Sequence, residues 1–168
     1  MFCYINDRIL ETGEAISSSF ADDTADKWGP KNAIDGLWSD TDGLLFKSKK
    51  ENMPWIQWHL PNTTNMIGIM ISSRNRERSD ELRHLEIRAG TSFVGKDFKG
   101  KMTINELCGT FKGPGKDRRV YTVMCSKEIQ ADYVTLQILD LDSVLEINEL
   151  EIITKSQGKF GSIVNNII

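Results

Sequence analysis

Short runs of strand-forming residues, each ended by turn residues, constrain the fold of this chain more than any other feature of its sequence. Turn-forming stretches LPNTTN, FKGPGKD and LDLDS separate several of these runs. Helix-period apolar stripes are scarce. Strands at about ten-residue spacing predict an all-β, antiparallel β-sandwich jelly roll. The runs are WIQWHL (55–60), MIGIMIS (66–72), HLEIRAG (84–90), RVYTVMC (119–125), DYVTLQIL (132–139) and LEINELEII (145–153).

Length and charge narrow the class of protein. The chain has 168 residues, 27% of them charged, with a formal net charge of −3. That length fits one domain with a real core, and the charge balance does not suit a duplex nucleic-acid binder. No apolar run is long enough to span a membrane, and no signal peptide is visible. We expect a domain over residues 1–155 and a C-terminal tail over 156–168 that could add an edge strand.

The first forty residues have few strand-length runs and many Asp, Ser and Gly, which predicts an ordered, loop-rich segment over one end of the sandwich. Within NAIDG, Asp35 and Gly36 form a turn that Ala33 and Ile34 anchor in the core. Farther along, Trp55 and Trp58 point to opposite faces of one strand, so at least one should be buried.

The stretch from Arg74 to Arg83 holds four arginines and three carboxylates. Charge runs of mixed sign usually face water, so one interpretation is a solvated connection between two strands. The other is a charged binding surface. The residues alone leave both open.

The motifs AISSSF, NAIDG, PWIQWHL, DYVTLQIL and LEINELEI together resemble the galactose-binding-like, discoidin-type (F5/8 type C) jelly roll. Within that group the chain looks most like the F-type, fucose-binding lectins, over residues 9–153. The resemblance to the F-type lectins rests on the alignment of the later part of the chain, above all on Cys108 and Cys125 around GTFKGPGKDRRVYTVM.

The resemblance implies a fucose site of one histidine and two arginines, with an aspartate between the arginines. Aligned without internal gaps, the histidine falls on Lys47, the first arginine on Arg74 and the second arginine on Glu81. Arg76 stands at the aspartate, and Arg78 at one of two adjacent cysteines. We predict that these five residues form an altered ligand-binding set that does not hold fucose but favours anionic glycans.

A two-residue shift would instead place Arg76 and Arg83 at the arginine pair, but it spoils the alignment of EIRAG. The ungapped alignment is therefore preferred. The same loop could equally be a vestigial site that now serves only as a solvated loop.

The resemblance also implies a structural calcium ion, which suits oxygen ligands. Leu44 falls where the family has a hydroxyl ligand, and Asp40 or Asp42 could compensate. The predicted set is Asn32 (main chain), Asp35, Leu37 (main chain), Asp40, Asn148 (main chain) and Glu149. The alternative is that Asp35 only caps a turn and Glu149 faces solvent.

The register further implies a Cys108–Cys125 disulfide, which leaves Cys3 free or paired with another chain. A second disulfide of the family is absent, because its positions are Leu45 and Asn148. A disulfide would place the protein outside the cell, secreted or as an ectodomain.

No catalytic carboxylate pair, nucleophile elbow or phosphate-binding glycine loop is present, so we expect no enzyme activity. The predicted function is a carbohydrate-recognition or adhesion module with a glycan or glycoprotein partner. Nucleic acid is not expected as a partner, and homo-oligomers are possible. The alternatives are a discoidin-type protein-interaction module and a membrane-surface binder, the latter suggested by Trp28, Trp38 and Phe46.

Overall fold

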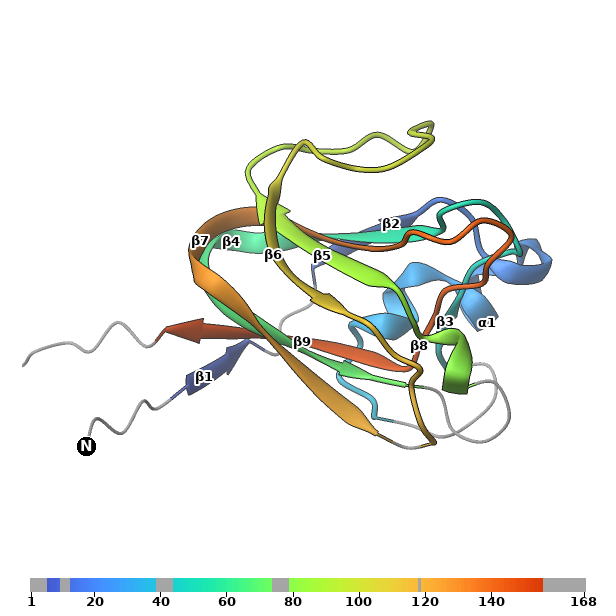
Figure 1. The fold of residues 1–168 in the computed structure, drawn as a ribbon, viewed down its shortest axis with the longest axis horizontal. Helices are drawn as coiled ribbons and strands as arrows, with labels where there is room; N and C mark the ends of the chain where they lie inside the picture. The colour runs from blue at the N-terminus through green and yellow to red at the C-terminus, as the bar shows by residue number, and fades with distance from the viewer. Residues whose placement is uncertain (1–5, 10–12, 39–43, 74–78, 118, 156–168) are drawn as a thin grey trace, which may run out of the picture.

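The computed structural model describes residues 6–9, 13–38, 44–73, 79–117 and 119–155 of the chain (Figure 1). Its strands are β1 (Asn6–Ile9), β2 (Glu14–Ser17), β3 (Phe46–Lys47), β4 (Trp55–Ser72), β5 (Leu85–Gly90), β6 (Glu106–Phe111), β7 (Val120–Ile138), β8 (Glu146–Ile147) and β9 (Glu149–Lys155). Its helical turns are η1 (Ala21–Asp23), α1 (Ala25–Trp28), η2 (Pro30–Ala33) and η3 (Ser79–Glu81).

Two long strands, β4 and β7, build the sandwich because each bends and serves in both layers (Figure 1). The first half of β4 pairs with β2 and with the second half of β7. Its second half pairs with β9 and with the first half of β7. Strands β5 and β6 extend one layer beyond β7, and β1 lies at the edge of the other beside β9. The predicted antiparallel sandwich is confirmed.

The sequence breaks at LPNTTN and at 126–131 do not interrupt their strands, contrary to the separate strands predicted there. Instead the ladder slips between His59 and Thr64 and then resumes, with Thr64 opposite Ala131 and Met66 opposite Ile129. Turn-forming residues are tolerated here because the strand bends from one layer to the other at this point, and such a bend requires an irregular stretch in the ladder. Conversely, the single run predicted over 145–153 divides into β8 and β9 at Asn148.

The loop over residues 91–105 arches over the outer face of one layer and creates a second small core (Figure 1). Trp58 lies in the main core, whereas Trp55 packs with Val94 and Met102 beneath this loop. Both tryptophans are therefore buried. The cover also explains why β5 is buried on both faces although its sequence alternates like a half-exposed strand.

The helical turns η1, α1 and η2 lie over one end of the sandwich, at the right of Figure 1, as predicted for this segment. The prediction of a loop-rich start is wrong for β1 and β2, which are strands of the large sheet. Ala33 and Ile34 enter the main core. Trp28 and Phe46 are buried too, so two of the three aromatic side chains that suggested membrane contact are not exposed; Trp38 is. No helix in the described part of the chain is long and apolar enough to span a membrane.

Candidate functional site

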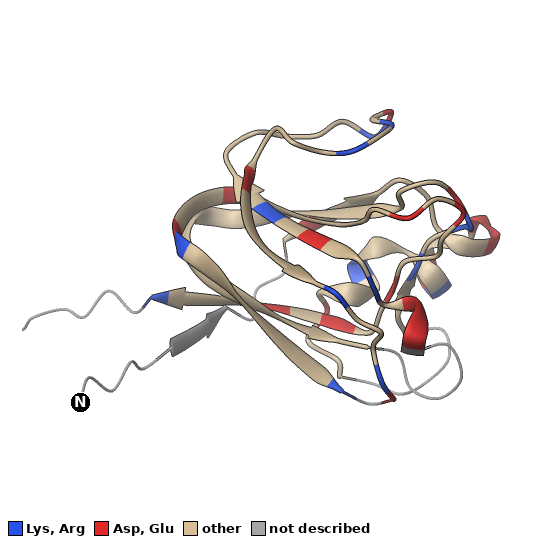
Figure 2. Ribbon diagram, in the orientation of Figure 1, with Lys and Arg blue, Asp and Glu red and all other residues tan. Residues whose placement is uncertain are grey.

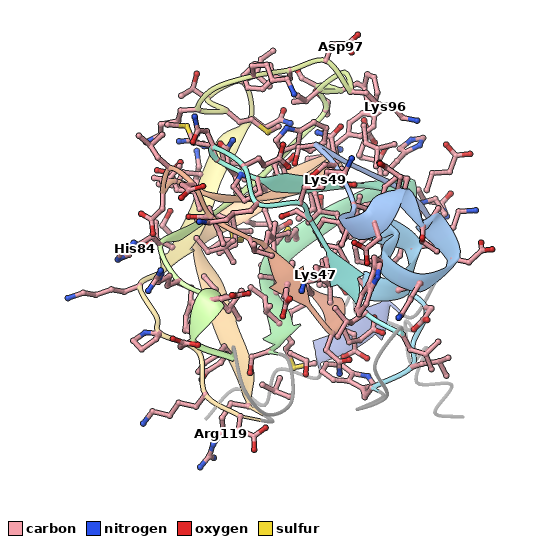
Figure 3. The ribbon with its side chains drawn as sticks, turned by 90° about the vertical axis from the view of Figure 1, so that its right-hand side faces the viewer. Lys47, Lys49, His84, Lys96, Asp97 and Arg119 are labelled. Atoms are coloured by element: carbon pink, nitrogen blue, oxygen red, sulfur yellow. A yellow bond between two sulfur atoms is a disulfide. The ribbon has the colours of Figure 1, made fainter. Side chains whose placement is uncertain are left out.

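A hollow of about 750 Å³ opens at the loop-bearing end of the sandwich, which faces the reader in Figure 3. We call it the loop-end pocket. Its walls combine side chains of both charge signs, and Figure 2 shows acidic and basic segments mingled at this end. The lining residues are Lys47, Lys49, Lys50 and Arg83, with Asp22, Glu81 and Asp142, and Ala21, Ser48, Ser143 and Val144.

Lys47 is held in the wall of this pocket by the short pairing of β3 with β8. That pairing sets Lys47 opposite Glu146, and Lys47 Nζ lies 2.7 Å from Glu146 Oε1. Glu146 is 1% exposed and Lys47 18% exposed at the side chain. Lys47 Nζ also lies 5.6 Å from the centre of the Trp28 ring. Its charge is therefore directed into the protein wall more than into the hollow.

The other cations of the pocket are more accessible. Lys49 Nζ contacts the exposed Asp23 at 2.6 Å, and Lys50 Nζ contacts the exposed Asp142 at 2.7 Å. Arg83 is half-exposed, and its Nε lies 3.7 Å from Asp140. Exposed pairs of this kind are worth little, at most about 1 kcal/mol, because water competes for both charges. An incoming anion can therefore replace these partners at low cost.

The structure places two of the five predicted ligand-binding residues, Lys47 and Glu81, on the wall of the same pocket. Arg74, Arg76 and Arg78 lie outside the described residues. The prediction missed Lys49, Lys50 and Asp142 altogether and set Arg83 aside. The cluster of lysines at residues 47–50 (KSKK) could have indicated Lys49 and Lys50. Nothing in the local sequence indicates that Asp142 lies beside them.

Within the predicted metal set, Asp35 and Glu149 come together. Gly36 has a positive φ of 77°, and Asp35 Oδ1 accepts a hydrogen bond from Leu37 N at 2.8 Å, which shapes the turn. Glu149 is 1% exposed at the start of β9 and accepts from Leu150 N at 3.2 Å. Burial, and then the neighbouring Asp35 carboxylate, raise the pKa of Glu149 to about 8, although the Leu150 and Gly36 amides oppose the shift.

These residues fit a hard cation. The Glu149 Oε2 atom is buried and meets no hydrogen-bond donor within the described residues, although a second carboxylate faces it. Such an arrangement is costly without a proton or a cation between the two groups. In the described part of the chain no three side chains of Asp, Glu, His or Cys are grouped so that they could hold a metal ion, so main-chain oxygens would have to complete a shell. Asp40 lies outside the described residues.

Cys108 and Cys125 are joined, with an S–S distance of 2.10 Å and a sequence separation of 17, as the family alignment implies. The bond ties β6 to the first half of β7, which belongs to the opposite layer from β5. Cys3 lies outside the described residues.

The fold and its loop-end pocket together define a galactose-binding-like jelly roll. The chain belongs to the F5/8 type C domain family, whose model matches residues 14–151. No sequence among the curated proteins matches this chain closely enough to count as a relative.

Several solved structures share the fold. A fucolectin from striped bass (Morone saxatilis) serum superposes with a TM-score of 0.77 at 20% identity, over 90% of this chain and 50% of that lectin. This chain thus spans half the length of that protein. A histidine mutant of the lectin-binding domain of lectinolysin, complexed with Lewis b, has a TM-score of 0.71 at 17% identity, over 92% of this chain and 100% of that domain.

A further similar structure is the family 32 carbohydrate-binding module from C. perfringens NanJ, in complex with galactose. Its TM-score is 0.67 at 17% identity, over 89% of this chain and 99% of that module. At these identities the likeness establishes the fold.

Proposed function

We propose that this chain is a non-enzymatic carbohydrate-recognition module and that its loop-end pocket binds a glycan carrying an anionic group. The observation that carries the proposal is the composition of this pocket, with four cationic and three acidic side chains at the loop-bearing end of the sandwich. The structural neighbours named for fucose, Lewis b and galactose binding support a sugar ligand. We expect such a module to act outside the cell, in adhesion to a glycoprotein.

Fucose is not the proposed ligand. Lys47, at the family's histidine position, is paired with the buried Glu146, and Glu81 sets a carboxylate where the family has an arginine. A sugar bound with millimolar Kd has only about 4 kcal/mol of binding free energy, and each charged hydrogen bond is worth roughly 1.5–3 kcal/mol. Losing two such contacts would abolish fucose binding. An anionic group would gain from Lys49, Lys50 and Arg83.

The test is a glycan array that includes neutral, sialylated and sulfated glycans at two salt concentrations. We expect anionic glycans to bind modestly and to weaken with salt, because the cations are exposed. Arg83→Ala and Lys49→Ala should each lower affinity about tenfold. Lys96→Ala is the matched control, since Lys96 is exposed on the 91–105 loop, away from the pocket (Figure 3). Tight fucose binding, or a ligand indifferent to Arg83, would contradict the proposal.

We also propose that calcium supports this end of the sandwich. Asp35 and Glu149 would supply carboxylates, and Asn32, Leu37 and Asn148 main-chain oxygens. The ion would neutralise the facing carboxylates and so fix the NAIDG turn against β9. Calcium-dependent melting, lost in Asp35→Ala, tests this role.

A discoidin-type protein-interaction module is the second candidate. Leu37, Trp38 and Leu44 are exposed apolar side chains near the same end, with Leu37 52% exposed. An array without any bound glycan, together with a protein ligand whose affinity falls in Leu37→Ser, would favour this function.

A further inference from the structure

A second pocket lies on the outer face of one sheet layer and shares no lining residue with the loop-end pocket. We call it the sheet-face pocket. It encloses about 240 Å³. Since a water molecule occupies about 30 Å³ in the liquid, this space suits a single ring-sized molecule and not a long oligosaccharide. Its lining is Glu14, Ile16, Gln57, His59, Phe93 and Tyr133.

Strand register puts the polar and aromatic groups of this pocket in one row. Glu14 on β2 is the cross-strand partner of His59 on β4, which in turn is the partner of Tyr133 on β7. The His59 and Tyr133 rings are stacked, with centroids 4.7 Å apart and planes 18° apart. Phe93, which comes from the 91–105 loop, lies 5.7 Å from Tyr133 by ring centroids. A carboxylate thus stands beside a wall of three rings.

Phe93 is 56% exposed, yet the backbone on both sides of it is pinned. Ser92 N donates to Asn105 Oδ1 at 3.1 Å, and Asn105 Nδ2 donates back to Ser92 O at 2.8 Å. On its other side, Val94 N donates to the buried Gln57 Oε1 at 3.1 Å. Gly90, at the base of the loop, leaves room for the Asn105 side chain that makes these two bonds, because a Cβ at position 90 would lie 2.6 Å from Asn105 Oδ1. The backbone that carries the exposed ring is therefore held in place, which favours a preorganised binding surface.

The far side of the same loop is anchored as well. Met102 N donates to Gln137 Oε1 at 2.9 Å, and Lys101 Nζ lies 2.8 Å from Glu86 Oε1. The loop is thus bonded to the sheet both near its start and near its end. The backbone position of Phe93 is therefore set by the fold.

Chemistry selects the class of ligand. The aromatic rings offer an apolar face, Glu14 accepts hydrogen bonds, and the His59 imidazole can both donate and accept. An apolar face with mixed donors and acceptors matches a sugar ring. A simple ammonium ion would gain nothing from a donor such as His59. Among the residues that the structure describes, Glu14 is the one formally charged side chain that lines the pocket, and no ion pair to another described residue neutralises it. An acidic sugar would therefore be repelled.

We infer that the sheet-face pocket is a second carbohydrate subsite, which takes one sugar ring without an acid group. The ring would stack on Phe93 and Tyr133 while Glu14 and His59 bind neighbouring hydroxyls. Glu14 and His59, as directly opposed cross-strand partners, are spaced to reach adjacent groups of one ring. This inference does not depend on the loop-end pocket, whose charge favours the opposite kind of sugar.

The test is an NMR titration of the full chain with methyl glycosides of glucose, galactose, mannose, fucose and N-acetylglucosamine. N-acetylneuraminic acid and choline serve as acidic and cationic probes. We expect at least one neutral glycoside, at tens of millimolar, to shift the signals of His59, Phe93 and Tyr133. Phe93→Ala should weaken this binding at least tenfold, and Glu14→Gln should weaken it several-fold.

Ile104→Ala is the matched control, because Ile104 is an exposed apolar residue of the same loop outside the pocket. It should leave the shifts unchanged, as should Arg83→Ala in the loop-end pocket, which separates the two sites. The inference is overturned if only choline or only the acidic sugar shifts these signals. It is equally overturned if no glycoside does, or if Phe93→Ala has no effect.

Discussion

Asp35 and Glu149 face one another across the junction between the NAIDG turn and β9, although 113 residues separate them in sequence. One carboxylate is exposed and the other is buried. Burial and the facing Asp35 charge together raise the pKa of Glu149 to about 8.

That pKa predicts how stability depends on pH in chelator. The unfolded value is near 4.5, so between about pH 5 and pH 8 the folded protein holds a proton that the unfolded chain has released. Stability should therefore fall as pH rises through this window, and Glu149→Gln should flatten the slope. Melting temperatures in EDTA across the range measure it. Glu106→Gln, at an exposed carboxylate of β6, is the matched control and should keep the slope.

Calcium should raise the melting temperature more at about pH 8 than at about pH 5, because the ion competes with the proton on Glu149. At ten times Kd the ion contributes about 1.4 kcal/mol, which corresponds to a few degrees. Asp35→Ala should abolish the calcium effect. If the wild-type chain melts identically with calcium and with EDTA at both pH values, the proposed ion site does not exist.

Lys47 and Lys49 should differ in their effect on stability. Lys47→Ala removes the ammonium beside the buried Glu146 and should cost about 1–3 kcal/mol, less than for a fully buried pair because Lys47 is partly exposed. Lys49→Ala breaks an exposed pair and should cost less than about 1 kcal/mol. Chemical denaturation measures both. Equal costs would show that the Lys47–Glu146 contact does not stabilise the fold.

Gln137 should anchor the 91–105 loop. Its Oε1 accepts from Met102 N, and its Nε2 donates to Met53 O and Gly100 O. Gln137→Leu leaves these backbone groups unpaired, and we expect a loss of about 1–3 kcal/mol and faster hydrogen exchange at Met102. The exposed Gln130 offers the control Gln130→Leu, which should change neither quantity. Unaltered Met102 exchange in Gln137→Leu would refute the anchoring role.

The disulfide should contribute about 3 kcal/mol, since it closes a loop of 17 residues. Replacing both Cys108 and Cys125 by serine should lower the melting temperature by several degrees. Non-reducing peptide mapping of the wild-type chain should find these two residues joined and Cys3 outside the pair. A link from Cys3 to either of them would overturn the assignment.

Local patterns in the sequence were enough for the fold class and part of the site. Alternating and continuous apolar runs predict strands at 55–60, 66–72 and 84–90, because side-chain direction alternates along any extended chain. The burial of Ala33 and Ile34, which anchors the NAIDG turn in the core, can likewise be predicted from the sequence. The resemblance to a family supplied the Cys108–Cys125 pairing and set Lys47 and Glu81 at one end.

Only the tertiary structure decided the rest. The union of two predicted strands into β4 follows from its ladder with β7, which no local signal encodes. Trp55 is buried because a loop 36 or more residues later covers it. Lys47 is neutralised by Glu146, and Glu149 is placed against Asp35, by contacts between segments far apart in sequence. Charge pairing and burial depend on which distant residues meet, and therefore on the packed fold and not on residue type.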